Sequence, residues 1–224
     1  MTAPRLAVFD LDHTLLSGDS DVLWCEFLLA RGELDRASFE ARNAEIEHAY
    51  RAGAISAQAF TEFYLSTLAG RARSSLLGLR DAFMREAIVP RIPQAARALV
   101  ESHRAGGDLL VLSTATNRFL VERTAPELGF EHLIATEPEL ESGVFTGRTE
   151  GVLNMREGKP VRLRDWLAVQ GHPPRLLAEA TAYSDSINDL SLLQAVARPV
   201  VVDPDARLLA HAQASGWQVL RLQR

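Results

Sequence analysis

The pattern of hydrophobic and polar positions predicts a short buried strand, then a long helical stretch, then alternating strands and helices. The first strand covers residues 5–9, where an unbroken run of strand-forming apolar residues ends at acidic and hydroxyl residues. Such a run is typical of a parallel strand that is buried on both faces. We therefore expect the carboxyl end of this strand to open into a polar crevice.

Residues 17–89 carry apolar side chains at helical spacing, with N-cap residues and glycines where helices would begin and end. The predicted helices cover residues 19–31, 35–52, 56–69 and 74–87. The second helix is expected to stop at Gly53. Four amphipathic helices with no strand between them predict a small helical bundle.

Two prolines interrupt the helical pattern at residues 89–93, because a residue before proline is pushed out of the α region. Strands and helices alternate after this point. The predicted strands cover residues 109–113, 133–135, 180–183, 199–202 and 217–220, and the predicted helices cover residues 93–105, 117–128, 159–169, 187–195 and 204–214. A turn at Ser142-Gly143 predicts an antiparallel hairpin over residues 139–149.

The alternation implies parallel strands joined by helical crossovers. The predicted fold class is α/β, with an open, parallel, Rossmann-like sheet that has helices on both faces. Residues 1–16 and 90–224 form the predicted α/β core domain, and residues 17–89 form a helical-bundle cap domain inserted directly after the first strand. In sheets of this kind the ligand binds beyond the carboxyl ends of the strands.

Charge and composition narrow the range of partners. The formal net charge of −5 argues against nucleic acid and anionic membranes, because both require a basic patch. No stretch approaches the ~20 apolar residues of a membrane span, and the amino terminus has no signal-peptide pattern. We expect a cytoplasmic protein without a membrane or nucleic-acid partner, and the sequence leaves its oligomeric state open. The single cysteine, Cys25, excludes an intramolecular disulfide.

Polar residues follow three of the predicted strands at their carboxyl ends. They are Asp10, Asp12 and Thr14, then Ser113 and Thr114, then Asp185, Asn188 and Asp189. If strand geometry persists, Asp10 and Asp12 leave the same face and His13 the opposite one. Two carboxylates in one small volume repel, so one stays protonated or a cation shares the site. Asp185 would add an oxygen ligand of the kind that magnesium accepts.

Each of these residues also has a purely structural interpretation. Asp185 and Asp189 could cap and flank a helix, and the first two acids could be solvated at a strand end. Ser113 and Thr114 could cap a helix or bind an anion at its amino terminus. Lys159 is the only lysine in a chain that otherwise uses arginine, which favours a need for a compact ammonium, although one occurrence also arises by chance.

Taken together, the polar motifs resemble the haloacid dehalogenase-like superfamily, in the order found in that family. The matching features are Asp10-x-Asp12-x-Thr14, a strand that ends in Ser113, the single Lys159, and Asp185-x-x-Asn188-Asp189. The helical insert after the first motif resembles the cap of the phosphoserine phosphatase-like branch. This resemblance covers nearly the whole predicted sheet domain.

The resemblance implies catalytic roles. Asp10 would be the nucleophile that becomes an aspartyl phosphate, and Asp12 would protonate the leaving group and then activate water. Ser113 and Lys159 would hold the phosphoryl oxygens, and we also expect Thr14, Thr114 and Asp19 to bind substrate. The acid at Asp12 favours phosphoester hydrolysis or phosphoryl transfer, because the superfamily's dehalogenases and ion pumps lack it.

The resemblance also implies a magnesium ion, Mg2+. Its ligands would be Asp10, Asp185 and the backbone carbonyl of Asp12, with Asn188 and Asp189 supporting the site. The predicted function is a magnesium-dependent phosphatase for a small phosphorylated metabolite. The alternatives are a phosphotransferase or mutase of the same superfamily, and a non-catalytic, receiver-like phosphate-binding switch that would give Asp12 and the cap no role.

The substrate is less defined by the sequence. Asp19 stands where phosphoserine phosphatases carry a glutamate that helps to recognise the substrate amine, and it either contacts substrate or caps the first cap helix. No arginine in residues 39–52 is assigned to a substrate carboxylate. The open classes are an amino-acid phosphate such as phosphoserine, an amino-alcohol phosphate such as histidinol phosphate, a lipid-derived phosphate and a sugar phosphate.

Overall fold

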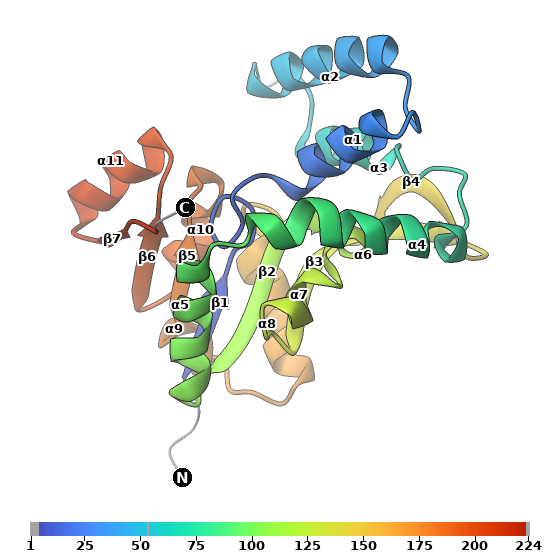
Figure 1. Ribbon diagram of the computed structural model, residues 1–224. Coiled ribbons are helices and arrows are strands. Elements are labelled where there is room, and N and C mark those ends of the chain that lie inside the picture. The colour runs from blue at the N-terminus through green and yellow to red at the C-terminus, as the bar shows by residue number, and fades with distance from the viewer. Residues whose placement is uncertain (1–4, 53, 223–224) are drawn as a thin grey trace.

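Seven strands form one sheet in the order β4-β3-β2-β1-β5-β6-β7 (Figure 1). The computed structural model describes residues 5–52 and 54–222 of the 224-residue chain. The strands are β1 (Leu6–Phe9), β2 (Leu109–Asn117), β3 (His132–Glu141), β4 (Val144–Glu150), β5 (Thr181–Ser184), β6 (Arg198–Val202) and β7 (Gln218–Leu220). All neighbouring strands are parallel except β3 and β4, which are antiparallel. The predicted α/β fold class is confirmed.

The helices cover the predicted positions in most of the chain. They are α1 (Ser20–Ala30), α2 (Arg36–Arg51), α3 (Ala57–Leu65), α4 (Arg73–Phe83), α5 (Gln94–Ala105), α6 (Arg118–Val121), α7 (Thr124–Glu127), α8 (Gly158–Val169), α9 (Arg175–Ala178), α10 (Leu190–Leu193) and α11 (Ala206–Ser215). The predicted stop at Gly53, like residues 1–4 of the predicted core domain, lies outside the described residues. Within the described part of the chain, every helix is too short or too polar to cross a membrane.

Strand β1 lies at the centre of the sheet and explains the apolar run that begins the chain. Ala7 and Phe9 belong to the hydrophobic cluster on one face, and Leu6 and Val8 belong to the cluster on the other. All four side chains are at most 1% exposed. Because side chains alternate along a strand, a strand covered on both faces has no polar position. Helix α5 packs on the first face and α8 on the second.

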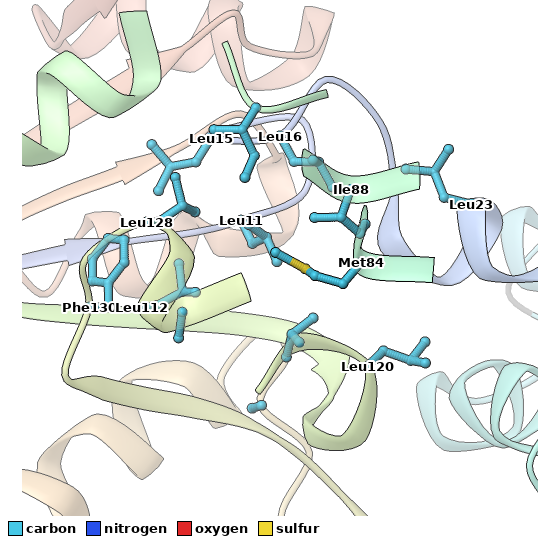
Figure 2. Packing of buried hydrophobic residues seen from close by; sticks show 14 of the residues in the cluster. Leu11, Leu15, Leu16, Leu23, Met84, Ile88, Leu112, Leu120, Leu128 and Phe130 are labelled. Carbon is cyan, nitrogen blue, oxygen red and sulfur yellow. The ribbon is translucent and has the colours of Figure 1, made fainter. Parts of the chain in front are cut away.

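The helices of residues 17–89 are not separate from the sheet in their packing. One continuous cluster joins Leu23 of α1 and Met84 after α4 to Leu11 and Leu112 of the sheet side (Figure 2). Among the helices of the insert, α2 lies farthest from the sheet (Figure 1). The first helices are capped as the sequence suggests, with Asp19, Asp35 and Ser56 each accepting backbone N–H groups.

The chain stays helical further than the prolines predict. Helix α4 continues through a π-helical segment (Met84–Ile88) and a 3₁₀ turn (Val89–Arg91), so Val89 is helical although it precedes Pro90. The Val89 N–H bonds the Met84 carbonyl, five residues back. This wider turn shifts the hydrogen-bond register just before the residue that has no N–H to donate. The backbone becomes extended only at Ile92, which precedes the second proline.

Three other predicted elements differ from the structure. The helix predicted at 117–128 is two short helices, α6 and α7, because β2 runs on to Asn117 and the chain bends again before Thr124. The strand predicted at 133–135 and the first arm of the hairpin are one strand, β3. Helix α9 had no prediction. These differences fall where long strands leave the sheet or where helices are shorter than a periodic pattern can reveal.

The β3–β4 hairpin connects the sheet to the helical insert. The Gly70 N–H bonds the Phe145 carbonyl at 2.8 Å, and the Phe145 N–H bonds the Arg71 carbonyl at 3.0 Å. The Arg73 N–H bonds the Gly143 carbonyl at 2.9 Å. Backbone hydrogen bonds of this kind fix the loop between α3 and α4 against the hairpin, so the orientation of the insert depends on an element far along the chain.

Two glycine substitutions should have opposite effects on stability. A Cβ at Gly158, the first residue of α8, would collide with the Leu153 carbonyl, so Gly158→Ala should lower the free energy of unfolding. At Gly78 in α4 nothing lies within 4 Å, so Gly78→Ala should raise it by about 0.5–1 kcal/mol. Urea unfolding measures both. A Gly158→Ala protein as stable as the parent would contradict the close approach.

Candidate active site

A cavity of about 200 Å³ opens where β1 and β5 end and the insert begins. The sheet side contributes Asp10, Asp12, Lys159, Asp185, Asn188 and Asp189. Helices α1, α2 and α3 and the turn before α1 contribute Asp19, Asp21, Tyr50, Phe60, Thr61 and Tyr64. The carboxyl ends of the central strands are where an open parallel sheet binds its ligand.

A larger cavity of about 650 Å³ lies at the other end of the strands. Its walls include Arg5 before β1, Asp108 before β2 and Arg198 at the start of β6. His103 lies between Asp108 and Tyr183 there, at 2.6 and 2.7 Å. Among the described residues that line this cavity, Asp108 is the one acid, whereas six aspartates line the smaller cavity, which is therefore the candidate active site despite its size.

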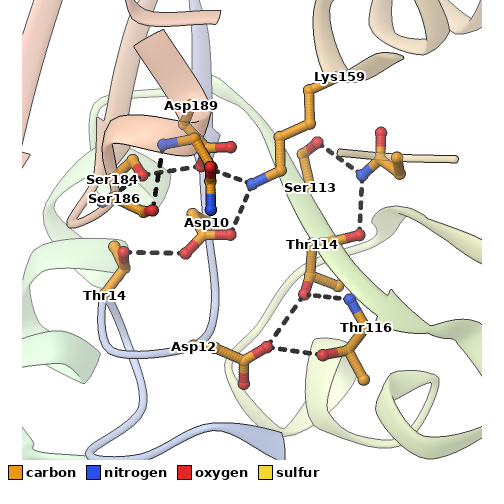
Figure 3. Close-up of polar contacts among 12 residues, drawn as sticks. Asp10, Asp12, Thr14, Ser113, Thr114, Thr116, Lys159, Ser184, Ser186 and Asp189 are labelled. Atoms are coloured by element: carbon orange, nitrogen blue, oxygen red, sulfur yellow. Dashed lines mark hydrogen bonds and ion pairs between the residues drawn. The ribbon is translucent and has the colours of Figure 1, made fainter. Parts of the chain in front are cut away.

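Lys159 is buried between two carboxylates of the site. Its Nζ lies 2.7 Å from Asp10 Oδ1 and 2.6 Å from Asp189 Oδ2 (Figure 3), and the side chain is 2% exposed. The Ser184 hydroxyl donates to the same Asp189 oxygen at 2.7 Å. Burial opposes the charged ammonium, but the charges of Asp10 and Asp189 outweigh it and raise the pKa of Lys159. The ammonium therefore stays charged beside Asp10.

Thr14 links Asp10 to Asp185. Its hydroxyl oxygen lies 3.0 Å from Asp10 Oδ2 and 3.0 Å from Asp185 Oδ1, and it accepts the Asp185 N–H at 3.0 Å. The two carboxylate oxygens, from residues near opposite ends of the chain, thus lie within twice that distance of each other. Thr14 is fully buried and does not line the cavity, so its predicted contact with substrate stays a prediction that this geometry does not favour. Its hydroxyl positions the two acids instead.

Asp12 is held by hydroxyl and amide donors from two elements. Its Oδ1 accepts the Ser20 N–H at 2.8 Å and the Ser20 hydroxyl at 2.5 Å, and its Oδ2 accepts the Thr116 hydroxyl at 2.7 Å. Burial, and next the charge of Asp19, raise the pKa of Asp12 to about 6 against the effect of these bonds. A carboxyl group in this range exchanges a proton readily near neutral pH.

His13 is on the side of the cavity, not on the opposite face from Asp12 as predicted. Strand β1 ends at Phe9, and the N–H groups of Thr14, Leu15 and Leu16 all bond the Leu11 carbonyl. His13 itself has a φ of +54°, a left-handed conformation that a strand does not contain. The alternation of a strand therefore does not extend past Phe9. Asp10 and Asp12 both line the cavity, as expected, but because of this tight turn and not because of the alternation of a strand.

Neither Ser113 nor Thr114 lines the cavity, so direct contact with substrate does not match the geometry of either. Ser113 is fully buried and its hydroxyl accepts the Asn154 amide at 3.0 Å. The Thr114 hydroxyl lies 3.4 Å from Asp12 Oδ2 (Figure 3). Consecutive residues of a strand face opposite sides, so only one of the two can be directed toward Asp12. In this part of β2 the cavity is lined by Ala115 and Thr116.

Asn154 is a buried residue that the sequence gave no reason to select. Its Nδ2 donates to the Ser113 hydroxyl at 3.0 Å, the Thr114 carbonyl at 2.9 Å and the Ile134 carbonyl at 3.0 Å. These contacts tie β2 to β3 directly beside the site. Asn154 lies between β4 and α8, outside any helix or strand, and no spacing or motif marks it.

Asp19 caps the first helix of the insert, and its contact with substrate stays a prediction. It is the N-cap of α1, since its Oδ1 accepts the N–H groups of Asp21 and Val22 at 2.9 and 3.0 Å. It also lines the cavity beside Asp21. Burial raises the pKa of Asp19, and burial followed by the charges of Asp19 and Asp12 raises the pKa of Asp21 well above its ordinary value.

Two carboxylates of the site fit a divalent cation. Burial raises the pKa of Asp10 to about 7, and burial followed by the charge of Asp10 raises that of Asp185 to about 8. The Thr14 hydroxyl has one proton to share between them, so positive charge is lacking at this point. Among the described residues, no three Asp, Glu, His or Cys side chains are arranged around one point. The ligand set that the resemblance implies has only two side-chain donors, Asp10 and Asp185, with the Asp12 backbone carbonyl as the third. Asp12 directs its carboxyl to Ser20 and Thr116 instead.

The chain matches the family model of haloacid dehalogenase-like hydrolases over residues 7–194. It is 38% identical over 220 residues to a histidinol-phosphatase of Neisseria meningitidis, covering 98% of this chain and 99% of that protein. It is 32% identical over 223 residues to the phosphoserine phosphatase SerB1 of Mycobacterium tuberculosis, covering 95% of this chain and 69% of that protein.

Solved structures give the same picture of the fold. A protein of unknown function from Bordetella pertussis superposes with a TM-score of 0.93 at 44% identity, covering 98% of this chain and 99% of that one. A substrate-bound phosphoserine phosphatase superposes with a TM-score of 0.70 at 15% identity, covering 98% and 94%. The latter similarity establishes the fold alone.

Loss of the Asn154 amide should destabilise the protein. Asn154→Ala leaves one hydroxyl and two carbonyl acceptors without their donor in the interior, where each unsatisfied group costs about 1–3 kcal/mol. We expect the free energy of unfolding in urea to fall by about 2 kcal/mol or more. The control is Asn43→Ala, whose partly exposed amide bonds Glu47 at 3.1 Å and should matter less. Equal losses in the two variants would contradict this account.

Proposed function

The chain belongs to the haloacid dehalogenase-like hydrolase family and is a phosphatase, and from this premise we propose that it hydrolyses a small phosphomonoester with magnesium through an aspartyl phosphate on Asp10. The observation that carries the proposal is the pairing of Asp10 with Lys159 at 2.7 Å and with Thr14 at 3.0 Å, at the edge of the cavity. In this proposal residues 17–89 are the cap, and residues 1–16 and 90–224 the catalytic core.

Asp10 acts as the nucleophile of the first step. One of its carboxylate oxygens forms a bond to phosphorus while the bond from phosphorus to the leaving oxygen breaks. Asp12, protonated, gives its proton to that leaving oxygen, and the alcohol departs. The charged Lys159 ammonium favours the ionised form of Asp10 and offsets the negative charge that gathers at the phosphoryl group.

Asp12 acts as the base of the second step. Its carboxylate takes a proton from water as the water oxygen bonds to phosphorus, and the bond between phosphorus and Asp10 breaks. Inorganic phosphate leaves, and the Asp10 carboxylate and the protonated Asp12 are restored. The donors Ser20 and Thr116 hold the Asp12 carboxyl in place and stabilise its ionised form.

Magnesium, held by Asp10, Asp185 and the Asp12 carbonyl, would supply positive charge that the phosphoryl group and the carboxylates lack. Thr14 orients Asp10 and Asp185 toward each other. Asp189 has a supporting role through Lys159, and Asn188 is exposed at the rim of the cavity. Membership of a hydrolase family argues against the alternative of a non-catalytic, receiver-like switch. The other alternative, phosphoryl transfer to a second acceptor, is distinguished from hydrolysis by an assay for released inorganic phosphate.

The names of the relatives supply the substrate classes. One relative is called a histidinol-phosphatase and another a phosphoserine phosphatase. An amino-alcohol phosphate and an amino-acid phosphate are therefore the two classes to test first. Both are small, in keeping with a cavity of about 200 Å³.

Turnover should depend on magnesium. Incubation of the protein with phosphomonoesters, histidinol phosphate and phosphoserine among them, should release inorganic phosphate in the presence of Mg2+. Removal of the metal with EDTA should reduce the rate by at least about 10²-fold, because charge stabilisation by a metal contributes several kcal/mol to catalysis. Readdition of Mg2+ should restore the rate. Undiminished turnover in EDTA would remove the metal from the mechanism.

Asp10→Asn should abolish turnover without unfolding the protein. The amide has no carboxylate to attack phosphorus, so kcat should fall by at least about 10³-fold. The protein should stay folded, with a lower melting temperature, because the variant keeps the size and shape of the side chain and Lys159 keeps its ion pair with Asp189. Asp165→Asn, at an exposed position of α8, is the control and should keep full activity. Retained activity in Asp10→Asn would exclude Asp10 as the nucleophile.

A further inference from the structure

The cavity is strongly acidic. Of the six aspartates that line it, Asp19 and Asp21 come from the cap side, and the described residues that bring basic side chains to it are Lys159 and His13. Lys159 already lies between Asp10 and Asp189. No arginine lines the cavity in the part of the chain that the structure describes. A substrate that carries a carboxylate would therefore meet negative charge on the side where its leaving group must lie.

Asp21 is an acid that phosphoryl transfer does not use. It lies in the first turn of α1 and faces the cavity, and the Asn117 amide reaches its Oδ1 at 3.3 Å. It enters no ion pair among the described residues. An acid near a helix amino terminus is normally favourable, but Asp19 already accepts the first N–H groups of this helix. A second acid, desolvated beside Asp19 and Asp12, destabilises the free protein unless a cation offsets it.

Aromatic rings from α2 and α3 line the same cavity as these acids. Tyr50 and Phe60 are stacked with ring centroids 4.2 Å apart, and Phe60 meets Tyr64 edge-to-face at 5.3 Å. All three line the cavity. Faces of aromatic rings attract ammonium and imidazolium groups. The Arg156 guanidinium lies over the Tyr50 ring, with its Cζ 5.3 Å from the ring centroid, and donates to the Tyr50 hydroxyl at 2.7 Å. Arg156 is exposed and does not line the cavity. It occupies the face of Tyr50 that a ligand cation would need, which leaves Phe60 and Tyr64 as the rings for such a cation.

We propose that the cap side of the cavity selects phosphomonoesters whose leaving group is cationic and carries no carboxylate, with Asp21 as the specificity-determining acid. The cation lies between this acid and the rings of Phe60 and Tyr64. An amino-alcohol phosphate has this charge pattern, whereas phosphoserine adds a carboxylate that the cavity does not pair. The inference rests on the proposed function and narrows its substrate class.

The volume of the cavity supports the same class. At about 200 Å³ it is below the range of roughly 300–1,000 Å³ that is usual for drug-sized ligands. It has room for a phosphoryl group and a short amine or one imidazole ring. A lipid-derived phosphate would extend far beyond it.

The test compares kcat/KM across four phosphomonoesters on the full-length protein. They are histidinol phosphate, phosphoethanolamine, phosphoserine and n-propyl phosphate, whose leaving group carries no charge. We expect each of the two amino-alcohol phosphates to exceed n-propyl phosphate by at least tenfold, and phosphoserine to fall below both. If the protein releases phosphate from none of the four, the proposed function itself fails. If phosphoserine is preferred, or if charge has no effect, the phosphatase stands and this inference is overturned.

Asp21→Asn assigns the selectivity to one side chain. The ratio of kcat/KM for phosphoethanolamine to that for n-propyl phosphate should fall at least tenfold, with the loss mainly in KM. Glu26→Gln, which removes an exposed acid from the same helix, should leave the ratio unchanged. Phe60→Leu provides a second variant that removes an aromatic ring from the cavity wall and should also lower the ratio. An unchanged ratio in folded Asp21→Asn, checked by its melting temperature, would exclude Asp21 as the selecting group.

Discussion

The structure depends on the pairing of one buried lysine with two buried carboxylates. Lys159 is 2% exposed and contacts Asp10 and Asp189 through its three-proton ammonium. A charge of this kind is costly to remove from water, and an isolated one would not persist in the interior. A buried ion pair of this kind contributes little net stability, so we explain it by its effect on Asp10. Burial disfavours the ionised form of Asp10, and the ammonium at 2.7 Å stabilises that form at the edge of the cavity.

The sheet brings these groups together because β1 is its central strand. Its neighbours β2 and β5 end at the same edge, so Thr116 and Asp185 reach the cavity beside Asp10 although they lie more than a hundred residues away. Helix α8 packs on the face that contains Leu6 and Val8, and its amino-terminal turn delivers Lys159. The apolar side chains on the two faces of β1 thus determine how the helices pack on the sheet. That packing in turn determines the distances among the charged groups.

The cap is tied to the site at both of its ends. Ser20, the first residue of α1, donates twice to Asp12, so the proposed acid and base is held by a residue of the insert. At the other end, the β3–β4 hairpin holds the loop before α4 through backbone hydrogen bonds. Asp21, the acid proposed to select the leaving group, lies in the same helix as Ser20, which holds Asp12. In the proposed mechanism, α1 therefore couples the choice of leaving group to its protonation.

The sequence alone determined the α/β class, the long helical insert and most of the cavity, because a buried central strand must be apolar and its carboxyl end must be polar. Asp10, Asp12, Asp19, Lys159, Asp185, Asn188 and Asp189 all line the cavity as the sequence indicated. Only the tertiary structure decided the side on which His13 lies, the burial of Thr14 and Ser113, the bonds of Asn154 and the docking of the hairpin. The physical reason is that side-chain direction follows from spacing only within a regular helix or strand. Beyond Phe9, and between β4 and α8, it is set by contacts with residues far away in the chain, and no local pattern records them.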